Sequence, residues 1–535
     1  MQKIFVFLLL CGMVFGEEYH QYVDFGGVPS GTVAGCVNVI TGDLTINQDD
    51  LVVRGHEPIR IQRRYFSQYD LFDRYVGWEC GFNHLIAKAN AKSESRGYLF
   101  LSIPEKMGIE IKYVVNREKA EEKLRKGKRA CFKLDKKARK LTNASLGELS
   151  ARNNPLNNVV HYKSDDIKEI IVEGADGVRR HYRAKESTHT LYHSCGGWEY
   201  YLYHEIFPNG NVMHYSWEKN GERRRLTKVK SCSPSGKVFA WVTFSYPDDR
   251  QKVIETSDGR TLKYTYQVLK HNNIKLWLLS TVECSSKPKE TYSSYWGAEP
   301  FGAYLANIHL PEGRHRKLER FQIGWNEEAN VHIKKKDVRE NPLYKRIRKI
   351  LDPVGPNDSL QIAYRFEYCP GEYEKYGGVT KVYDACGNFT NYHYDKNFWL
   401  TSVRSHSHGG GLLSVESYDW NMNGWIRSKS ISRGDGIPLI ARQYQYDSSG
   451  NVKLEEFWGN HTGAVPGKLA YRGSTVISNG SEGYHISREY NEKNLLVKEI
   501  FPSEKIIEYF YYGGIAKVNC FSYRQCSLKS SSIPH

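Results

Sequence analysis

Polar and apolar residues alternate along short segments of this chain, and each segment follows a tight turn. After Gly387, the residues Thr390, Tyr392 and Tyr394 stand two positions apart. Residues i and i+2 share one face of a strand, so this spacing predicts a β-strand with an aromatic, buried face and a polar, solvated face. Gly387 and Asn388 tolerate the positive φ angles that a tight turn needs. The stretch therefore predicts a β-hairpin.

The same spacing recurs elsewhere, which indicates a repeat. Two aromatic residues stand five and seven positions after a turn glycine in three places: Tyr215 and Trp217 after Gly210, Tyr264 and Tyr266 after Gly259, and Tyr392 and Tyr394 after Gly387. A Tyr-Asp pair precedes the turn at Tyr383-Asp384 and again at Tyr446-Asp447, although no paired tyrosines follow Gly450. Each buried ring removes roughly 150–250 Å² from water, so we interpret these residues as structural and not catalytic.

Two stretches resemble the RHS, or YD-repeat, family. The first is the Y-D-x-x-G-N pattern at 383–388 with its paired tyrosines, together with R-L-T-K-V at 225–229. The second is 41–67, which resembles the lead-in of such arrays, with Gly77-Trp78 following where the family places a Gly-Trp pair. The resemblance implies an all-β fold in which a YD-repeat β-hairpin array forms a curved or spiral sheet, as part of a shell.

In the YD-repeat family, such sheets wind into hollow shells that often enclose a C-terminal toxin, and self-cleavage after a closing core motif releases that toxin. Related modules in animals act in adhesion. This sequence departs from the family pattern, since it contains neither a recognisable closing motif rich in Asp-Pro, Gly and Asn-Pro nor an effector domain. The resemblance therefore implies a shell segment or a truncated remnant of a larger RHS toxin.

Repeats, charge and composition divide the chain into seven parts. We expect a signal peptide (1–16), an N-terminal lead-in β region (17–110), a charged basic insertion (111–155), YD-like repeats (156–283), a basic irregular region (284–360), further YD-like repeats (361–512) and a frayed tail (513–535). Stacked repeats share one continuous core, so these parts need not fold separately.

The N-terminus predicts export. Lys3 supplies a charged region, the stretch 4–10 an apolar run, and 14–16 a cleavage site, with cleavage expected after Gly16. A lipoprotein acylated on Cys11 is the alternative. No later segment has the roughly 20 apolar residues that span a bilayer. We therefore expect an extracellular or cell-envelope-associated protein without a transmembrane segment.

The chain is basic, with 76 Lys and Arg against 60 Asp and Glu and a net charge of +16. The basic residues gather at 119–140, 223–225, 314–320 and 334–349. Nucleic acid binding would use such patches for phosphate contacts, but no recognition motif accompanies them. Near an anionic envelope surface, each close Lys or Arg contributes about 1 kcal/mol. We expect cell-surface glycans, an anionic envelope surface or another shell segment as partners, and not nucleic acid.

The sequence offers little catalytic chemistry. His204-Glu205 precedes Ile-Phe-Pro and so lacks the second His of a zinc-protease helix, while 463–468 is one residue short of a phosphate loop. Cys195 beside His193 is interpreted as part of a turn between strands. Ten cysteines follow the predicted signal, without a C-x-x-C pair; their even number permits disulfides. We expect no catalytic residue, cofactor or metal.

Three functions compete on this basis. The first is a secreted or cell-surface, non-enzymatic YD-repeat scaffold, in one form a segment of a toxin-encapsulating shell. The second is a surface adhesin or carbohydrate-binding protein, because aromatic faces stack on sugars. The third is an enzyme, either a hydrolase within 284–350, where the repeat pattern lapses, or a self-cleaving protein. The repeats and the lead-in favour the first.

Overall fold

The computed structural model describes most of the chain from residue 31 to residue 522. The described residues are 31–67, 75–82, 85–90, 98–104, 110–116, 119, 122–123, 125–126, 131–134, 159–162, 169–174, 177–184, 198–220, 223–271, 274–296, 303–309, 314–321, 346–354, 359–370, 377–422, 425–448, 450–459, 468–472, 475–479, 482–491, 495–502, 505–512 and 515–522. Residues 1–30, with the predicted signal peptide and its cleavage site at Gly16, lie outside this part.

Short strands make up nearly all of the described structure. Those of the N-terminal segment, which we define as residues 31–82, are β1 (Thr32–Val33), β2 (Val37–Asn38), β3 (Thr45–Val53), β4 (Ile59–Phe66) and β5 (Trp78–Gly81). Those of the large sheet are β6 (Ile86–Asn90), β7 (Tyr98–Pro104), β8 (Glu110–Asn116), β9 (Cys131–Leu134), β10 (Val159–Tyr162), β11 (Glu169–Glu173), β12 (Arg179–Ala184), β13 (Trp198–Ile206), β14 (Val212–Asn220), β15 (Arg223–Cys232), β16 (Val238–Ser245), β17 (Gln251–Thr256), β18 (Thr261–His271), β19 (Ile274–Cys284), β20 (Lys287–Trp296), β21 (Ala303–His309), β22 (His315–Arg320), β23 (Ile347–Val354), β24 (Ser359–Pro370), β25 (Gly378–Asp384), β26 (Phe389–Tyr394), β27 (Leu400–His406), β28 (Leu412–Trp420), β29 (Ile426–Arg433), β30 (Pro438–Tyr446), β31 (Val452–Gly459), β34 (Glu482–Tyr490), β35 (Leu496–Ile500), β36 (Lys505–Tyr512) and β37 (Ile515–Ser522). The hairpin of β32 (Lys468–Arg472) and β33 (Thr475–Asn479) is a separate two-stranded sheet that packs against β30.

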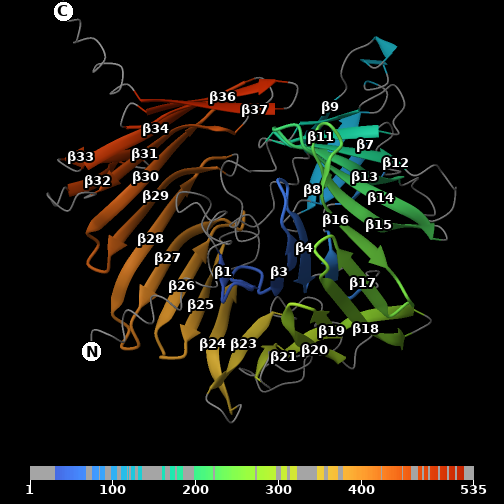
Figure 1. Cartoon of the computed structure of the whole chain (residues 1–535). Helices are drawn as coiled ribbons and strands as arrows, with labels where there is room; N and C mark the ends of the chain where they lie inside the picture. Colours follow the sequence, from blue (N-terminus) through green and yellow to red (C-terminus); the bar gives the residue numbers. More distant parts are fainter. Residues whose placement is uncertain are drawn as a thin grey trace, which may run out of the picture.

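The large sheet is an antiparallel meander. Each strand pairs with the next one along the chain from β6 to β31, then β31 pairs with β34 and the order continues to β37. The first half of β13 also pairs with β6, while its last residues pair with β14, so the strands from β6 to β13 close into a ring. Beyond this ring the sheet curves around the N-terminal strands β3 and β4 (Figure 1). The prediction of an all-β hairpin array forming a curved sheet is confirmed.

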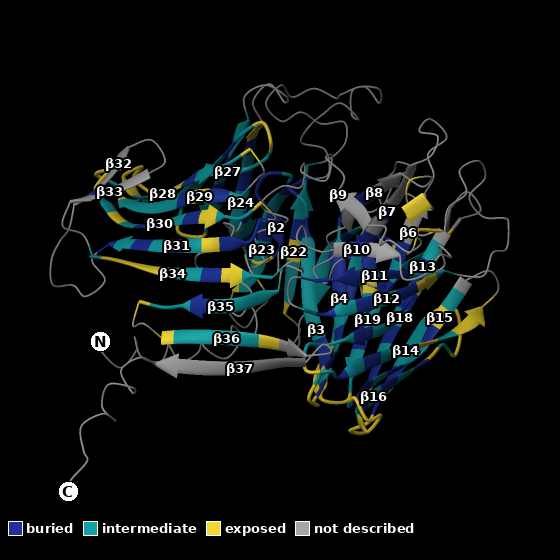
Figure 2. Ribbon diagram, turned by 90° about the horizontal axis from the view of Figure 1, so that it is seen from above, coloured by how far each residue is buried: buried dark blue, intermediate teal, exposed yellow. Residues whose placement is uncertain are grey.

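The core lies between the N-terminal segment and the face of the sheet that surrounds it, which we call the inner face. Tyr215 and Tyr264 point from the sheet into this core, where they are almost fully buried together with Ile59 and Ile61 of β4. On β14, Met213 and Tyr215 are buried whereas Ser216 is exposed, as the alternating sequence requires. Figure 2 shows the resulting dark and light bands along the strands.

Several ranges expected to be irregular contain strands. The range 284–360 holds β20 to β23, which continue the meander. Residues 515–522, which we expected to lie in a frayed tail, form β37 and pair with β36, since Ala516, Val518 and Cys520 give this stretch an apolar alternation. Within 111–155, residues 119, 122, 123 and 125 are helical and 131–134 form β9.

In the part of the chain that the structure describes, no helix has the length and hydropathy of a membrane span.

Candidate functional site

An aspartate organises the backbone of the repeat turn at 383–388. Asp384 accepts hydrogen bonds through Oδ1 from the backbone N–H groups of Cys386 and Asn388, both at 2.9 Å, and through Oδ2 from the Asn388 side chain at 2.9 Å. Gly387 adopts a φ of 81°, and its N–H donates to the Asp384 carbonyl at 3.1 Å. The Y-D-x-x-G-N pattern therefore encodes a turn in which Asp binds the backbone and Gly supplies the left-handed residue.

The same turn recurs along the sheet. Asp447 accepts hydrogen bonds from the backbone N–H of Asn451 at 2.9 Å and from its side chain at 2.8 Å, and Gly450 has a φ of 89°. Gly210 and Gly259, which open the two other clear repeats, have φ angles of 85° and 83°. All four turn glycines singled out in the sequence thus occupy the backbone conformation that L side chains rarely adopt.

Many of the strand pairs contain a β-bulge. At several of these bulges an aromatic side chain donates a hydrogen bond to the backbone carbonyl, and we call this contact an aromatic cap. Between β28 and β29, Asp419 is paired with Ser428 and Trp420 with Ile426, so Arg427 has no register partner. The Ile426 carbonyl accepts a hydrogen bond from the hydroxyl of Tyr446 at 2.7 Å. Because a bulge disrupts the ladder locally, this hydrogen bond restores a partner to a carbonyl that lies at the irregularity.

The pattern of bulge and aromatic cap occurs repeatedly. Further caps at such bulges run from Trp217 Nε1 to Leu202, Tyr246 to Leu226, Tyr368 to Ile347, Trp420 Nε1 to Leu400 and Tyr490 to Val452, at 2.7–3.2 Å. Packing alone would accept Phe at these positions, whereas the cap requires a polar tip on the ring. This role was not predicted, although a sequence signal exists: several caps come twenty residues after the carbonyl that they bind.

The other repeat tyrosines divide between the two faces of the sheet. Tyr264, Tyr266 and Tyr394 are buried, while Tyr392 is half-buried. Tyr383 is also half-buried but lies on the opposite, outer face, since its neighbour Val382 belongs to the core. The repeat residues are thus distributed along the sheet and do not converge on one site.

An ion network joins the N-terminal segment to the inner face. Arg63 of β4 is fully buried, and its guanidinium lies 3.0 Å from Asp50 of β3 and 2.7 Å from Glu290 of β20. The hydroxyl of Tyr264 donates to Asp50 at 2.6 Å, and that of Tyr292 donates to Glu290 at 2.6 Å. Burial raises the pKa of Asp50 to about 6 despite the nearby Arg63. We call these five residues the Arg63 lock.

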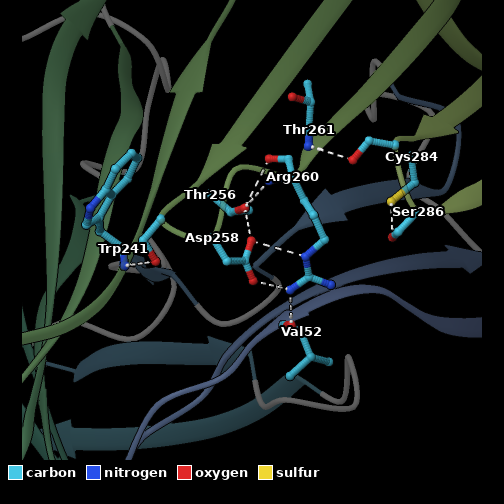
Figure 3. Close-up of polar contacts among 10 residues, drawn as sticks. Val52, Trp241, Thr256, Asp258, Arg260, Thr261, Cys284 and Ser286 are labelled. Atoms are coloured by element: carbon cyan, nitrogen blue, oxygen red, sulfur yellow. Dashed lines mark hydrogen bonds and ion pairs between the residues drawn. The ribbon is translucent and has the colours of Figure 1, made fainter.

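A second anchor holds β3 near the turn between β17 and β18 (Figure 3). Arg260 donates a hydrogen bond to the Val52 carbonyl at 2.6 Å, and Asp258 fixes the same guanidinium at 2.5 Å. Hydrogen bonds from Arg260 hold the pKa of Asp258 at about 2. Thr256 donates to Asp258 at the base of the turn. The turn thus presents a pre-positioned guanidinium to the N-terminal segment.

Further hydrogen bonds continue along the segment toward β25. The Ile347 N–H donates to the Gly42 carbonyl at 3.0 Å, and Arg346 donates to the Ile40 carbonyl at 3.1 Å. Farther along the sheet, Thr380 of β25 donates to the carbonyl of residue 39. The N-terminal segment therefore contacts strands of the sheet from β14 to β25, and the lead-in stretch that resembles the YD-repeat family occupies the inside of the curve.

Burial of the inner face decreases beyond β25. One register row near the other end of the segment, Met213, Ser231 and Ala240, is at most 5% exposed. The row that begins with the fully buried Thr380 continues through half-buried side chains on β26 to β29, which are Tyr392, Val403, Glu416 and Ile431. This row of the inner face of β26 to β29 is thus only partly covered, whereas Tyr394, Leu400, Tyr418 and Ile426 on the same strands are buried.

The candidate catalytic groups noted in the sequence do not assemble. Glu205 is buried and accepts a hydrogen bond from Tyr215 at 2.7 Å, whereas His204 points to the outer face. The stretches around Cys195 and Gly463 lie outside the described residues. Burial raises the pKa of the Cys36 and Cys80 thiols to about 11, so neither is a thiolate at neutral pH.

The described cysteines and the basic stretch at 223–225 give no further site. Among the cysteines whose side chains the structure describes, none forms a disulfide; these are Cys36, Cys80, Cys232, Cys284, Cys369 and Cys386. Within the described ranges, no three His, Cys, Asp or Glu side chains form a group that could hold a metal ion. In the basic stretch at 223–225, Arg225 lies over the ring of Tyr246 at 4.9 Å, and Arg224 donates a hydrogen bond to Tyr203. These arginines therefore take part in packing.

No protein-family model and no curated protein matches the sequence. Among solved structures, the chain is similar to TcdB2-TccC3 without its hypervariable C-terminal region, at 10% identity and a TM-score of 0.33, and to TcdB2-TccC3-Cdc42, at 10% identity and a TM-score of 0.35. Each match covers 89% of this chain and 27% of the other. The N-terminal domain of effector protein SpvB from Salmonella typhimurium strain LT2 matches at 9% identity and a TM-score of 0.24, over 49% of this chain and 98% of that one. These TM-scores are too low to support an argument, so the fold class rests on the strand pairing itself.

Proposed function

We propose that this chain is a non-enzymatic scaffold of the YD-repeat type, exported or held at the cell surface, whose curved sheet is one segment of a larger β-shell. The observation that carries the proposal is the change in burial along the inner face. Where the N-terminal segment lies against the sheet, the side chains of the inner face are buried. On β26 to β29, the inner-face residues Tyr392, Val403 and Ile431 are only half-buried. Apolar inner-face residues that are only partly covered fit a surface that a further polypeptide completes.

The partner expected on this surface is another polypeptide segment, either cargo or a second part of the shell. Its contacts should be mixed in character, because Tyr392 and Val403 stand in the same row as Glu416. Absence of catalysis is part of the proposal. It agrees with the use of Asp384, Asp447 and Asp258 in turns, where each carboxylate is already bound to its own loop.

A photo-crosslinking amino acid at position 403 tests the proposal in the native host. Val403 faces inward, and its neighbour Arg404 is exposed on the outer face, so position 404 is a matched control on the same strand. We expect crosslinks from position 403 to a second polypeptide and few from position 404. A crosslink-free chain that purifies as a monomer, with a cysteine at position 403 freely reactive toward maleimide, would contradict the proposal.

Glycan binding on the outer face is a second candidate, favoured by a row of rings. Tyr383, Phe389 and His406 are register partners on β25, β26 and β27, with ring centroids 5.7 Å and 4.5 Å apart. Lys381 lies 3.9 Å from the Phe389 centroid and Arg365 lies 3.9 Å from that of Tyr383. Aromatic faces with adjacent cations suit acidic polysaccharides.

Heparin chromatography and a glycan array at low salt test this second candidate. We expect the Phe389→Ala variant to elute earlier than the wild type, because it removes the middle ring of the row. Phe457→Ala is a suitable control, since Phe457 is buried on the inner face. Equal retention of the wild type and F389A would exclude the ring row as the binding surface.

A further inference from the structure

Three histidines lie side by side across neighbouring strands on the outer face. In the strand register, His181 of β12 is the partner of His204 of β13, and His204 is the partner of His214 of β14. Met213 and Tyr215, which flank His214, are buried on the inner face, so the His214 side chain points the other way. All three histidine residues are half-buried, although Nε2 of His181 is itself buried.

Two of these imidazoles approach each other edge to edge. Nδ1 of His204 lies 3.0 Å from Nδ1 of His214, and the rings are inclined at 86° with centroids 4.9 Å apart. Two nitrogens bound to one Zn²⁺ ion are about 2.8–3.4 Å apart, for bonds of about 2.0–2.1 Å and an angle of about 90–110°. The observed separation lies within this range, and adjacent strands fix the two backbones. An ion can therefore replace the proton that links the rings, with small ring rotations.

We propose that His204 and His214 form a bidentate site for a transition-metal ion such as Zn²⁺, Ni²⁺ or Cu²⁺, with His181 as the next imidazole in the row. Imidazole nitrogen suits these ions, whereas Mg²⁺ prefers oxygen ligands. On binding, the ring that donates the shared Nδ1 proton changes tautomer: that proton leaves to solvent and Nε2 of the same ring takes one up, so both neutral imidazoles present an Nδ1 lone pair to the ion. Water, or a side chain of another molecule, completes the coordination.

Lys230 of β15 sets the strength of this site. It is the register partner of His214, on the side away from His204, and it brings a positive charge next to the ligands. Like charges repel, so an ammonium group at this position opposes cation binding. Lys230→Ala should therefore tighten metal binding, an effect opposite in sign to that of any variant that damages the fold.

Isothermal titration of the full-length, untagged protein with ZnCl₂ and, separately, NiCl₂ tests the proposal, with MgCl₂ as the negative control. His204→Ala or His214→Ala should each weaken binding about 100-fold, because the loss of one of two linked contacts leaves a single ligand. His309→Ala is the matched control. His309 and His315 are also cross-strand partners, but their rings lie 5.8 Å apart at 31°, closer to face to face than edge to edge.

A spectroscopic measurement keeps the test independent of variant folding. The electron paramagnetic resonance spectrum of wild-type protein with one equivalent of Cu²⁺ should show hyperfine coupling to two imidazole nitrogens, and His214→Gln should show one fewer. Absence of Zn²⁺ and Ni²⁺ binding by the wild type would establish a hydrogen-bonded pair only and overturn the proposal. Weaker binding by H309A but not by H204A would overturn it as well.

Discussion

Replacement of Arg63 by methionine tests the lock between the N-terminal segment and the sheet. The side chain is 0% exposed, and its guanidinium lies 3.0 Å from Asp50 and 2.7 Å from Glu290. Methionine keeps most of the length and the apolar stem but removes the charge, so the buried Asp50 and the partly buried Glu290 lose their counter-ion. Breaking a buried ion pair in this way costs about 3–5 kcal/mol, and we expect R63M to lower the free energy of unfolding by about that amount.

Urea denaturation followed by tryptophan fluorescence measures this effect. The Trp78 ring centroid lies 6.0 Å from the Arg63 guanidinium, and Trp78 is one of the 11 tryptophans whose combined emission follows unfolding. Arg60→Met is the matched control on the same strand, because the ion pair of Arg60 with Asp49 at 3.0 Å is partly exposed and contributes at most about 1 kcal/mol. Equal losses in R63M and R60M would refute the view that the lock holds the segment.

Charge neutralisation of the whole lock separates ionic from steric effects. In the triple variant R63M/D50N/E290Q the shapes of the side chains are nearly kept, but no buried charge remains. Replacement of a complete buried ion network is often neutral or stabilising, whereas removal of one partner is not. We therefore expect the triple variant to be more stable than R63M. A triple variant less stable than R63M would show that steric misfit, and not uncompensated charge, causes the loss.

Three further predictions concern single residues. The pKa of Asp50 rises from 3.8 to about 6 on folding, so the folded state holds this proton more tightly. Relative to D50N, the wild type should therefore lose about 2 kcal/mol as the pH rises from about 4 to 7, and an unchanged difference in urea midpoint at the two pH values would contradict this. Tyr446→Phe removes the cap of the Ile426 carbonyl and should cost about 1–2 kcal/mol, measured as a lower urea midpoint, whereas an unchanged midpoint would show that the cap adds nothing. Gly387→Val should cost about 1–3 kcal/mol through its φ of 81°, and more than Gly259→Val at a φ of 83°, because only a Cβ at 387 would clash with a neighbouring side chain, that of His408. Equal melting temperatures for the wild type and G387V would contradict the turn assignment.

Local features of the fold could be predicted from the sequence because their causes are local. The alternation around Tyr215 and Tyr264 and the turn glycines Gly259 and Gly387 determine hairpins within about twenty residues. The position of the N-terminal segment could not be predicted in the same way. Asp50 binds a tyrosine 214 residues away, and no periodicity within either stretch encodes that pairing.

The aromatic caps were missed for a different reason. A burial pattern treats Tyr446 and Trp420 as apolar rings, whereas their hydrogen bonds depend on bulges that only the strand register reveals. Strand β37 was missed because its apolar side, Ala516, Val518 and Cys520, has small side chains between polar neighbours. The His204–His214 pair was missed because a loop separates its members and only pairing brings them together.

Because the N-terminal segment is buried inside the sheet, it cannot complete its folding until later parts of the chain have been synthesised. Residue 39 leaves the ribosome first, but its partner Thr380 lies 341 residues later in the chain. At about 5–20 residues per second, an emerging segment waits on the order of 20–70 seconds before its binding surface exists. The apolar residues at this end of the segment, Val39 and Ile40, lack the partner strand that covers them in the folded protein throughout that interval. The nascent chain is thus a natural client for a holding chaperone, and contact formation over such long separations makes completion of the fold slow.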